Sequence, residues 1–267
     1  MNILGKRYYF FAASLAIILA GLVILLFVTK VPLSIDFTGG SALEVTFASA
    51  SPQPAELIGI FEDAGIKDVQ VQTTEAGGYI VRSEFLQNEQ RDAIVSALNK
   101  KFGEVNIVRF DSVGPSIGKQ VTSRGALAVA VSSLLVVLFI AWSFRGVHNA
   151  FRYGVCAVLA MIHDVAIIFA ITGFGSWLFG WEIDSLFLSA LLTVIGFSMQ
   201  DTIVVFDRIR ENSNIYRRLD FETLVNHSIV QTLQRSINTQ LMTVEFLLLA
   251  LALFGGVTLR EFAAILL

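Results

Sequence analysis

Long apolar segments limit what this chain can fold into. The chain has five such segments, and the length of each is close to the roughly 20 residues that a helix needs to cross the hydrocarbon core of a bilayer. The chain of 267 residues is 55% hydrophobic and 15% charged, whereas soluble domains carry about 25% charged residues. The pattern predicts a polytopic α-helical membrane protein. The five segments are Tyr8–Thr29, Gly125–Phe144, Tyr153–Phe174, Leu186–Phe206 and Ser236–Gly256.

Basic residues in the short loops predict the orientation of these spans. Lys6 and Arg7 precede the first span, Arg145 and Arg152 lie between the second and third, and further arginines follow the fourth. Lysine and arginine gather in cytoplasmic loops. We therefore expect a cytoplasmic N-terminus, with the long segment after the first span outside.

The last residues begin another apolar run, Phe262–Leu267, which is too short to cross a membrane. We expect a sixth span that is truncated here. The predicted organisation is a first span at 8–29, an extracytoplasmic domain at 30–122, and a bundle at 123–267 that holds spans two to five and the start of a sixth.

Residues 30–122 have the charge density of a soluble domain. Alternating and helical patterns follow one another in the order βαββαβ, with a hairpin turn at Ala76-Gly77-Gly78. This order is that of the ferredoxin-like α+β unit. The predicted elements are Ser41–Phe47, Pro54–Ala64, Val69–Thr73, Tyr79–Arg82, Asn88–Phe102 and Val105–Phe110.

Two glycine-containing motifs border this domain, Ile35–Gly40 and Gly114–Lys119. The second resembles a phosphate-binding loop, but its spacer is one residue short and Gln120 stands where a Mg²⁺-binding hydroxyl is needed. We interpret both motifs as turns and hinges at the membrane joints. The hinge candidates are Asp36, Gly39, Gly40, Gly114, Pro115 and Gly118.

Asp201 lies inside the fourth apolar segment. A charge at bilayer depth costs roughly 2.5–3.5 kcal/mol on insertion scales, so an aspartate there is a functional candidate. Ser198 lies one helical turn before it and Gln200 lies beside it. The alternative is a structural aspartate that is hydrogen-bonded and never changes its protonation.

A polar stripe on the fifth segment offers a partner for Asp201. Its members recur at helical spacing, so we expect them to face the bundle, with Arg235 at the depth of Asp201. Burial favours a protonated carboxyl group and a nearby cation favours the charged form, and that balance suits proton exchange. The alternative is that Arg235 extends to the cytoplasmic surface. The stripe is Gln231, Arg235, Asn238, Met242 and Glu245.

His163 and Asp164 lie in the third segment. With only His148 and His227 besides, the chain offers too few ligands for a metal centre, and an interhelical hydrogen bond is the expected role of His163. Glu245 needs a partner of its own or a proton. A net charge of −3 argues against nucleic acid as a ligand.

These motifs together resemble the SecF family of bacterial protein-translocase subunits, or the SecF half of fused SecDF proteins. The resemblance covers nearly the whole chain in order. Two departures stand out, because relatives usually have Gly-Tyr-Ser-Ile-Asn where this chain has Gly196–Gln200, and an uncharged residue where it has Glu245. The matching stretches are Ile35–Gly40, Val113–Gly118, His163-Asp164, Asp201–Glu211 and Gln231–Ser236.

The resemblance implies a non-enzymatic subunit of the bacterial inner membrane within the RND superfamily. It implies SecD, the SecYEG channel, YajC and SecA as partners and an unfolded preprotein as client. Protons would be the coupling ion without any cofactor or metal. Asp201 and Arg235 would form the proton-coupling pair, supported by Asp164, His163, Ser198, Gln200, Gln231 and Asn238. The alternatives are a proton-coupled RND-type small-molecule transporter and a purely structural membrane subunit.

Overall fold

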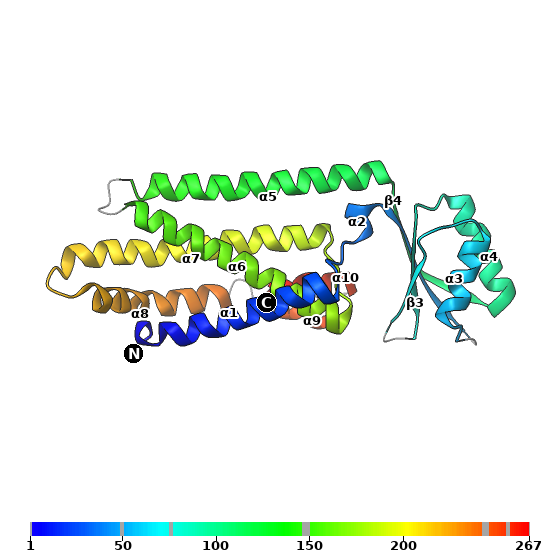
Figure 1. Ribbon diagram of the computed structural model, residues 1–267. Coiled ribbons are helices and arrows are strands. Elements are labelled where there is room, and N and C mark those ends of the chain that lie inside the picture. The colour runs from blue at the N-terminus through cyan, green and yellow to red at the C-terminus, as the bar shows by residue number, and fades with distance from the viewer. Residues whose placement is uncertain are drawn as a thin grey trace. The chain divides into compact units, whose positions relative to one another are not determined.

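The computed structural model describes residues 2–48, 51–74, 77–145, 150–241, 246–254 and 257–266. Within these ranges the side chains of 150, 246, 247, 251 and 257–261 are not described. The chain divides into two compact units. One comprises Met1–Pro32 and Ala126–Leu267, and the other comprises Leu33–Gly125. Figure 1 shows the helices of the first unit and the small sheet of the second.

The Leu33–Gly125 unit is a four-stranded antiparallel sheet with two helices. Its strands follow the order β2-β3-β1-β4, so the first strand lies between the third and the fourth. Pro54 starts α3 in its first turn, and Gly103, at φ 84°, ends α4. The elements are α2 (Ile35–Thr38), β1 (Gly40–Phe47), α3 (Pro54–Asp63), β2 (Gln70–Thr73), β3 (Tyr79–Ser83), α4 (Asn88–Phe102) and β4 (Val105–Val113).

One face of this sheet packs on α3 and α4. Leu43 and Val45 alternate with outward residues along β1, as a half-buried strand requires, and Leu57, Phe61 and Ile94 cover them from the helices. All five side chains are fully or almost fully buried. The predicted strands and helices of this segment are confirmed as elements. Ala76 of the predicted hairpin lies outside the described residues, while the antiparallel pairing of β2 with β3 is observed.

The two glycine motifs lie against each other in this unit. Gly39 has φ 75°, a conformation that favours glycine, and a Cβ atom there would lie 2.9 Å from the Cα atom of Pro115. A Cβ atom on Gly118 would lie 2.8 Å from the Gly39 backbone nitrogen. The glycines therefore allow two backbones to approach closely.

The other unit is a bundle of helices. Within it α6 packs against both α1 and α7, and α8 packs against α7 (Figure 1). The elements are η1 (Leu4–Lys6), α1 (Arg7–Val23), η2 (Ile24–Val28), α5 (Pro115–Ser143), α6 (Ala150–Phe179), α7 (Ser185–Ile215), α8 (Phe221–Gln240), α9 (Phe246–Phe254) and α10 (Val257–Leu266). The residues of α5 up to Gly125 belong to the Leu33–Gly125 unit.

Small residues permit the close contact of α1 with α6. A Cβ atom on Gly21 would lie 2.5 Å from Ala170, and Gly173 faces Gly21 one turn further along. Small residues at such positions let membrane helices approach until their backbones touch. The contact fixes the first apolar segment alongside the third.

Four helices among the described residues are long and apolar enough to cross a membrane. They span Leu4–Val28, Pro115–Ser143, Phe151–Phe179 and Ser185–Ile215, close to the first four predicted segments. The fifth predicted segment, 236–256, is described only in part, as the end of α8 and as α9. The structure therefore supports four spans.

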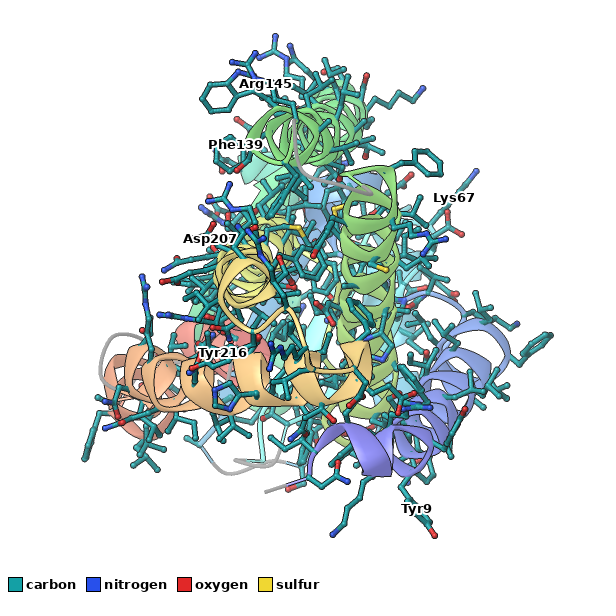
Figure 2. All side chains as sticks on the ribbon, turned by 90° about the vertical axis from the view of Figure 1, so that its left-hand side faces the viewer. Tyr9, Lys67, Phe139, Arg145, Asp207 and Tyr216 are labelled. Carbon is teal, nitrogen blue, oxygen red and sulfur yellow. The ribbon has the colours of Figure 1, made fainter. Side chains whose placement is uncertain are left out.

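The N-terminal segment packs against the start of α8 at one end of the bundle. The Arg7 guanidinium lies 3.1 Å from the Glu222 carboxylate, and the backbone N–H groups of Ile3 and Leu4 donate to the Asn226 side chain at the start of α8. Figure 2 looks onto this end and labels Arg145, where α5 has just ended. The start of α1, the end of α7 and the start of α8 therefore share one end.

Candidate functional site

Asp201 lies on α7 and meets two side chains of α8. The Gln240 Nε2 atom donates to its Oδ2 atom at 3.2 Å, and the Ser236 hydroxyl donates to its Oδ1 atom at 3.5 Å. The Asp201 side chain is half-buried. At 1.5 Å per residue it lies about 24 Å along α7 from Ser185, within a hydrocarbon core of about 30 Å. The carboxylate therefore lies in a polar contact between two helices, inside the apolar run of a helix that is long enough to cross a membrane.

Arg235 does not fill the position that the sequence predicted for it. Among the ion pairs that the described residues form, none joins Arg235 to Asp201, and the guanidinium side chain is exposed. Successive helical residues are turned by about 100°, so the face that brings Ser236 to Asp201 turns its neighbour aside. Arg235 instead lines a cavity of about 380 Å³ with Asp207, Arg208 and Glu211.

Of the three described members of the predicted polar stripe of α8, Gln231 bonds to Asn212 of α7 and the other two do not bond to that helix. Arg235 and Asn238 are exposed, whereas the buried residues of α8 are Leu224, Ser228 and Thr232. Continuing this row by four residues reaches Ser236 and then Gln240. The interface is formed by this row because its small side chains permit close approach to α7. Met242 and Glu245 lie outside the described residues.

Asp164 joins α6 to α7. The Ser198 hydroxyl donates a short hydrogen bond to the Asp164 Oδ2 atom, and the His163 Nδ1 atom lies 3.0 Å from Oδ1. The sequence assigned an interhelical hydrogen bond to His163. In the structure Asp164 makes the interhelical hydrogen bond, and His163 bonds to Asp164 beside it. Adjacent residues on one helix point in different directions, so only one of the two faces α7.

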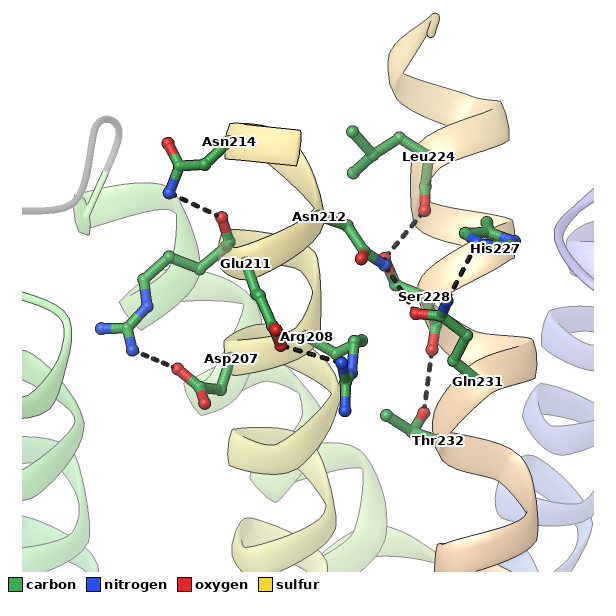
Figure 3. A network of polar contacts seen from close by, with 11 residues as sticks. Asp207, Arg208, Glu211, Asn212, Asn214, Leu224, His227, Ser228, Gln231 and Thr232 are labelled. Atoms are coloured by element: carbon green, nitrogen blue, oxygen red, sulfur yellow. Dashed lines mark hydrogen bonds and ion pairs between the residues drawn. The ribbon is translucent and has the colours of Figure 1, made fainter. Parts of the chain in front are cut away.

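Asn212, which the sequence did not single out, centres a second polar contact between α7 and α8. Its side chain is buried, and its Nδ2 atom donates to the Ser228 hydroxyl at 2.8 Å and to the Gln231 Oε1 atom at 2.9 Å. Gln231 also lies 3.0 Å from the His227 Nε2 atom. Figure 3 shows Asn212 reaching from α7 to α8 between these partners.

The same region holds ion pairs within α7. Arg208 pairs with Glu211 at 2.8 Å, and Arg210 pairs with Asp207 (Figure 3). Beyond this helix Asp220 caps α8, because its carboxylate accepts a hydrogen bond from the Thr223 backbone N–H at 3.0 Å. That bond lowers the pKa of the Asp220 carboxyl.

The remaining predicted residues divide between the two units. Gln200 is exposed beside Asp201. In the Leu33–Gly125 unit, Asp36 lies in α2, and the Gly114 carbonyl accepts from the Ile117 and Gly118 backbone N–H groups as α5 begins. Together with Gly39, Gly40 and Pro115 these residues form a tight joint within that unit. They lie in its backbone and take no part in the α6–α7–α8 contacts.

These observations define the class first: a multi-pass membrane protein with polar contacts inside its bundle. A family model described as "Protein export membrane protein SecD/SecF, C-terminal" matches residues 94–267, and one described as "SecD/SecF GG Motif" matches residues 24–50.

The chain belongs to the SecF family. It is 61% identical over 269 residues to the protein translocase subunit SecF of Anaerolinea thermophila, covering 100% of this chain and 87% of that protein. It is 40% identical over 282 residues to the SecF of Thermobaculum terrenum, again covering 100% of this chain and 87% of that one.

Fused relatives and a solved structure extend the comparison. The protein translocase subunit SecDF of Thermus thermophilus is 35% identical over 271 residues, which cover 98% of this chain and 35% of that protein. A crystal structure of SecDF, described as a translocon-associated membrane protein, superposes with a TM-score of 0.83 at 32% identity. This chain is covered completely and spans 35% of the SecDF chain.

Proposed function

We propose that this protein is an accessory subunit of the Sec export machinery that uses the proton motive force to assist polypeptide translocation. The names of its relatives support the role in export. The proton-coupled step is supported by one observation above all, namely that Asp201, inside the apolar run of α7, lies in the α7–α8 contact. An ionisable group inside the membrane is costly to keep, and proton relays are built from such groups.

In this proposal Asp201 binds a proton from the outer side and releases it to the cytoplasm. The charged carboxylate accepts from Gln240 and Ser236, and the protonated form needs a different set of bonds. Each cycle therefore changes the contact between α7 and α8. Arg235, on the cavity with Asp207 and Arg208, would influence the exit of the proton and would not pair with the carboxylate.

The energy available is sufficient for such a change. One proton that crosses 100 mV and one pH unit releases about 3.7 kcal/mol. A free energy of that size shifts a two-state equilibrium several hundred-fold. The hydrogen bond between Ser198 of α7 and Asp164 of α6 would carry the change to α6.

We further propose that the Leu33–Gly125 unit is an extracytoplasmic domain of the ferredoxin-like class. Its strand order β2-β3-β1-β4 and the element order βαββαβ support this assignment. A fifth span would run from the end of α8 through α9. The lysine and arginine residues of the short loops support a cytoplasmic N-terminus in the bacterial inner membrane.

The proposed partners follow from the family. SecD is the first, because a SecDF relative carries a matching region within one fused chain. The SecYEG channel, YajC, SecA and the unfolded preprotein complete the set. The subunit would have no catalytic residue, and protons would serve as its coupling ion without a cofactor.

The test is export into inverted membrane vesicles that contain the protein with its partner subunits. Export is measured with ATP in the presence of a proton gradient and after a protonophore. We expect Asp201→Asn to reduce the part of export that depends on the proton gradient at least tenfold. The matched control is Asp63→Asn, an exposed aspartate at the end of α3 and outside the helix bundle, which should keep the gradient-dependent part of export. Full gradient dependence in Asp201→Asn would refute the coupling role.

A further inference from the structure

The Asp201 carboxylate meets a neutral amide in the α7–α8 contact. Gln240, the last residue of α8, donates to its Oδ2 atom at 3.2 Å, which is the shorter of its two hydrogen bonds. The side chains of Gln240 and Ser236 are both half-buried, one helical turn apart on the face turned to α7. The carboxylate is therefore held from α8 by uncharged groups.

We propose that Gln240 is a positioning residue that holds the Asp201 carboxyl against α8 and sets the pH at which it binds its proton. This inference rests on the proposed function, because it concerns the same carboxyl group. It assigns to an amide the contact that the sequence had assigned to the Arg235 guanidinium.

The chemistry of the amide suits a group that must be bound in two states. A carboxamide carries two N–H donors and one carbonyl acceptor at the same end of the side chain. It donates to a charged carboxylate, and after a half-turn it accepts from the O–H of the protonated acid. A guanidinium carries donors only and cannot accept from the O–H of the protonated acid. Gln240 thus keeps the helices in contact through the whole cycle.

Other charged groups near α7 are engaged elsewhere or placed apart. On α6, Asp164 is bound by Ser198 and His163, and on α7 itself Asp207 pairs with Arg210. On α8, Arg235 lines the cavity. On α10, Arg260 and Glu261 have side chains outside the described set. Of the side chains that the structure describes, Gln240 and Ser236 are those that bond the Asp201 carboxylate.

The experiment titrates the carboxyl group directly. The intact complex in lipid nanodiscs is followed by infrared absorption of protonated carboxyl groups as the pH is lowered, and Asp201→Asn identifies the band that belongs to Asp201. Loss of a hydrogen bond to a charged group corresponds to about one pH unit in the midpoint, or tenfold in proton affinity. We expect Gln240→Leu to raise the midpoint by about that amount.

Two further variants make the result specific. Gln240→Lys places a fixed cation at the carboxylate and should lower the midpoint by about one unit or more. Gln234→Leu is the matched control, because Gln234 is an exposed glutamine of the same helix, and it should leave the midpoint unchanged. A packing role alone would not produce shifts of opposite sign. If the leucine variant fails to assemble, Gln240→Met carries the test, because methionine has nearly the same length as glutamine and no hydrogen-bond donor.

The outcomes separate the two proposals. A titrating Asp201 band whose midpoint is the same in the wild type, Gln240→Leu and Gln240→Lys would overturn the role of Gln240 and leave the proposed function standing. An Asp201 that shows no titrating band between pH 4 and 10 (about the range of ordinary side chains) would overturn both.

Discussion

The α7–α8 interface contains two polar contacts that differ in their chemistry. Near the end where α7 leads into α8, the buried Asn212 donates to Ser228 and Gln231 at 2.8 and 2.9 Å, and every group in the contact is neutral. Deeper along the helices, the half-buried Asp201 accepts from Gln240 and Ser236 at 3.2 and 3.5 Å. The Asn212 contact is short and has Asn212 and Ser228 buried with Gln231 at its exposed edge, and the Asp201 contact is longer, partly open and ionisable.

This difference suggests that one contact stabilises the helix pair and the other changes with protonation. A neutral network whose hydrogen bonds are satisfied stabilises the packing of two helices and contains no group that must gain or lose a proton during a cycle. An ionisable contact with longer bonds can be remade when a proton arrives. We infer that the Asn212 contact holds the two helices together while the Asp201 contact switches.

The largest expected effect comes from the Asp201 contact. Asp201→Asn should abolish proton-driven export while it changes the free energy of unfolding by less than about 1 kcal/mol, because an amide still accepts from Gln240. Unfolding of the detergent-solubilised complex, followed by circular dichroism, measures the second quantity. A large loss of stability would instead place Asp201 among the structural residues.

Asn212→Leu should show the opposite behaviour. It removes both donors and leaves Ser228 and Gln231 without their partner, at a cost of about 1–3 kcal/mol in the free energy of unfolding. Proton-driven export per folded complex should persist. Asn214→Leu is the control, since Asn214 is exposed and donates only to the Arg210 carbonyl of its own helix. Equal stability of the two variants would contradict the structural role of Asn212.

A smaller effect is expected at the α6–α7 contact. Ser198→Ala removes the hydroxyl that donates to Asp164, and we expect proton-driven export to fall about fivefold, which corresponds to about 1 kcal/mol. Ser189→Ala is the matched control on α7, because Ser189 donates to a carbonyl of the same helix. If proton-driven export is as fast in Ser198→Ala as in this control, the Ser198–Asp164 hydrogen bond does not take part in coupling.

The smallest effect concerns the cap of α8. Hydrogen bonding from Thr223 lowers the pKa of Asp220, so this carboxylate adds stability above its unfolded pKa of about 3.9. That stability is lost as the pH falls through the lowered folded value. Asp220→Ala should therefore unfold at a lower temperature than the wild type at pH 7, and the gap should narrow below pH 4. A gap that is constant with pH would show that the charge of Asp220 is not involved.

The glycine joint offers a contrast that needs no partner protein. Gly118→Ala places a Cβ atom 2.8 Å from the Gly39 backbone nitrogen, and backbone cannot yield as a flexible side chain can. We therefore expect Gly118→Ala to lower the temperature of thermal unfolding. Gly114→Ala is the control, because its Cβ atom meets no atom within 4 Å and Gly114 needs no positive φ, so it should lower that temperature less. Gly103→Ala also meets no atom within 4 Å, but the alanine would have to adopt φ 84°.

Local patterns were sufficient to predict much of the fold. The alternation in Ser41–Phe47 and the helical spacing in Asn88–Phe102 correspond to β1 and α4, because side-chain periodicity and burial are local properties of a strand or helix. The apolar runs predicted the four long apolar helices for the same reason, since a helix forms along a run of that length and composition. Asp201 was found because a charge interrupts such a run.

The sequence by itself thus determined which segments are long and apolar enough to cross a membrane, and that Asp201 lies within one of them. Only the tertiary structure decided what that side chain meets. A rotation of α8 by one residue, about 100°, exchanges Arg235 for Ser236 at the interface. Periodicity fixes that a helix has a polar face, but the close packing of small residues such as Ser228 against α7 fixes which face is turned inward.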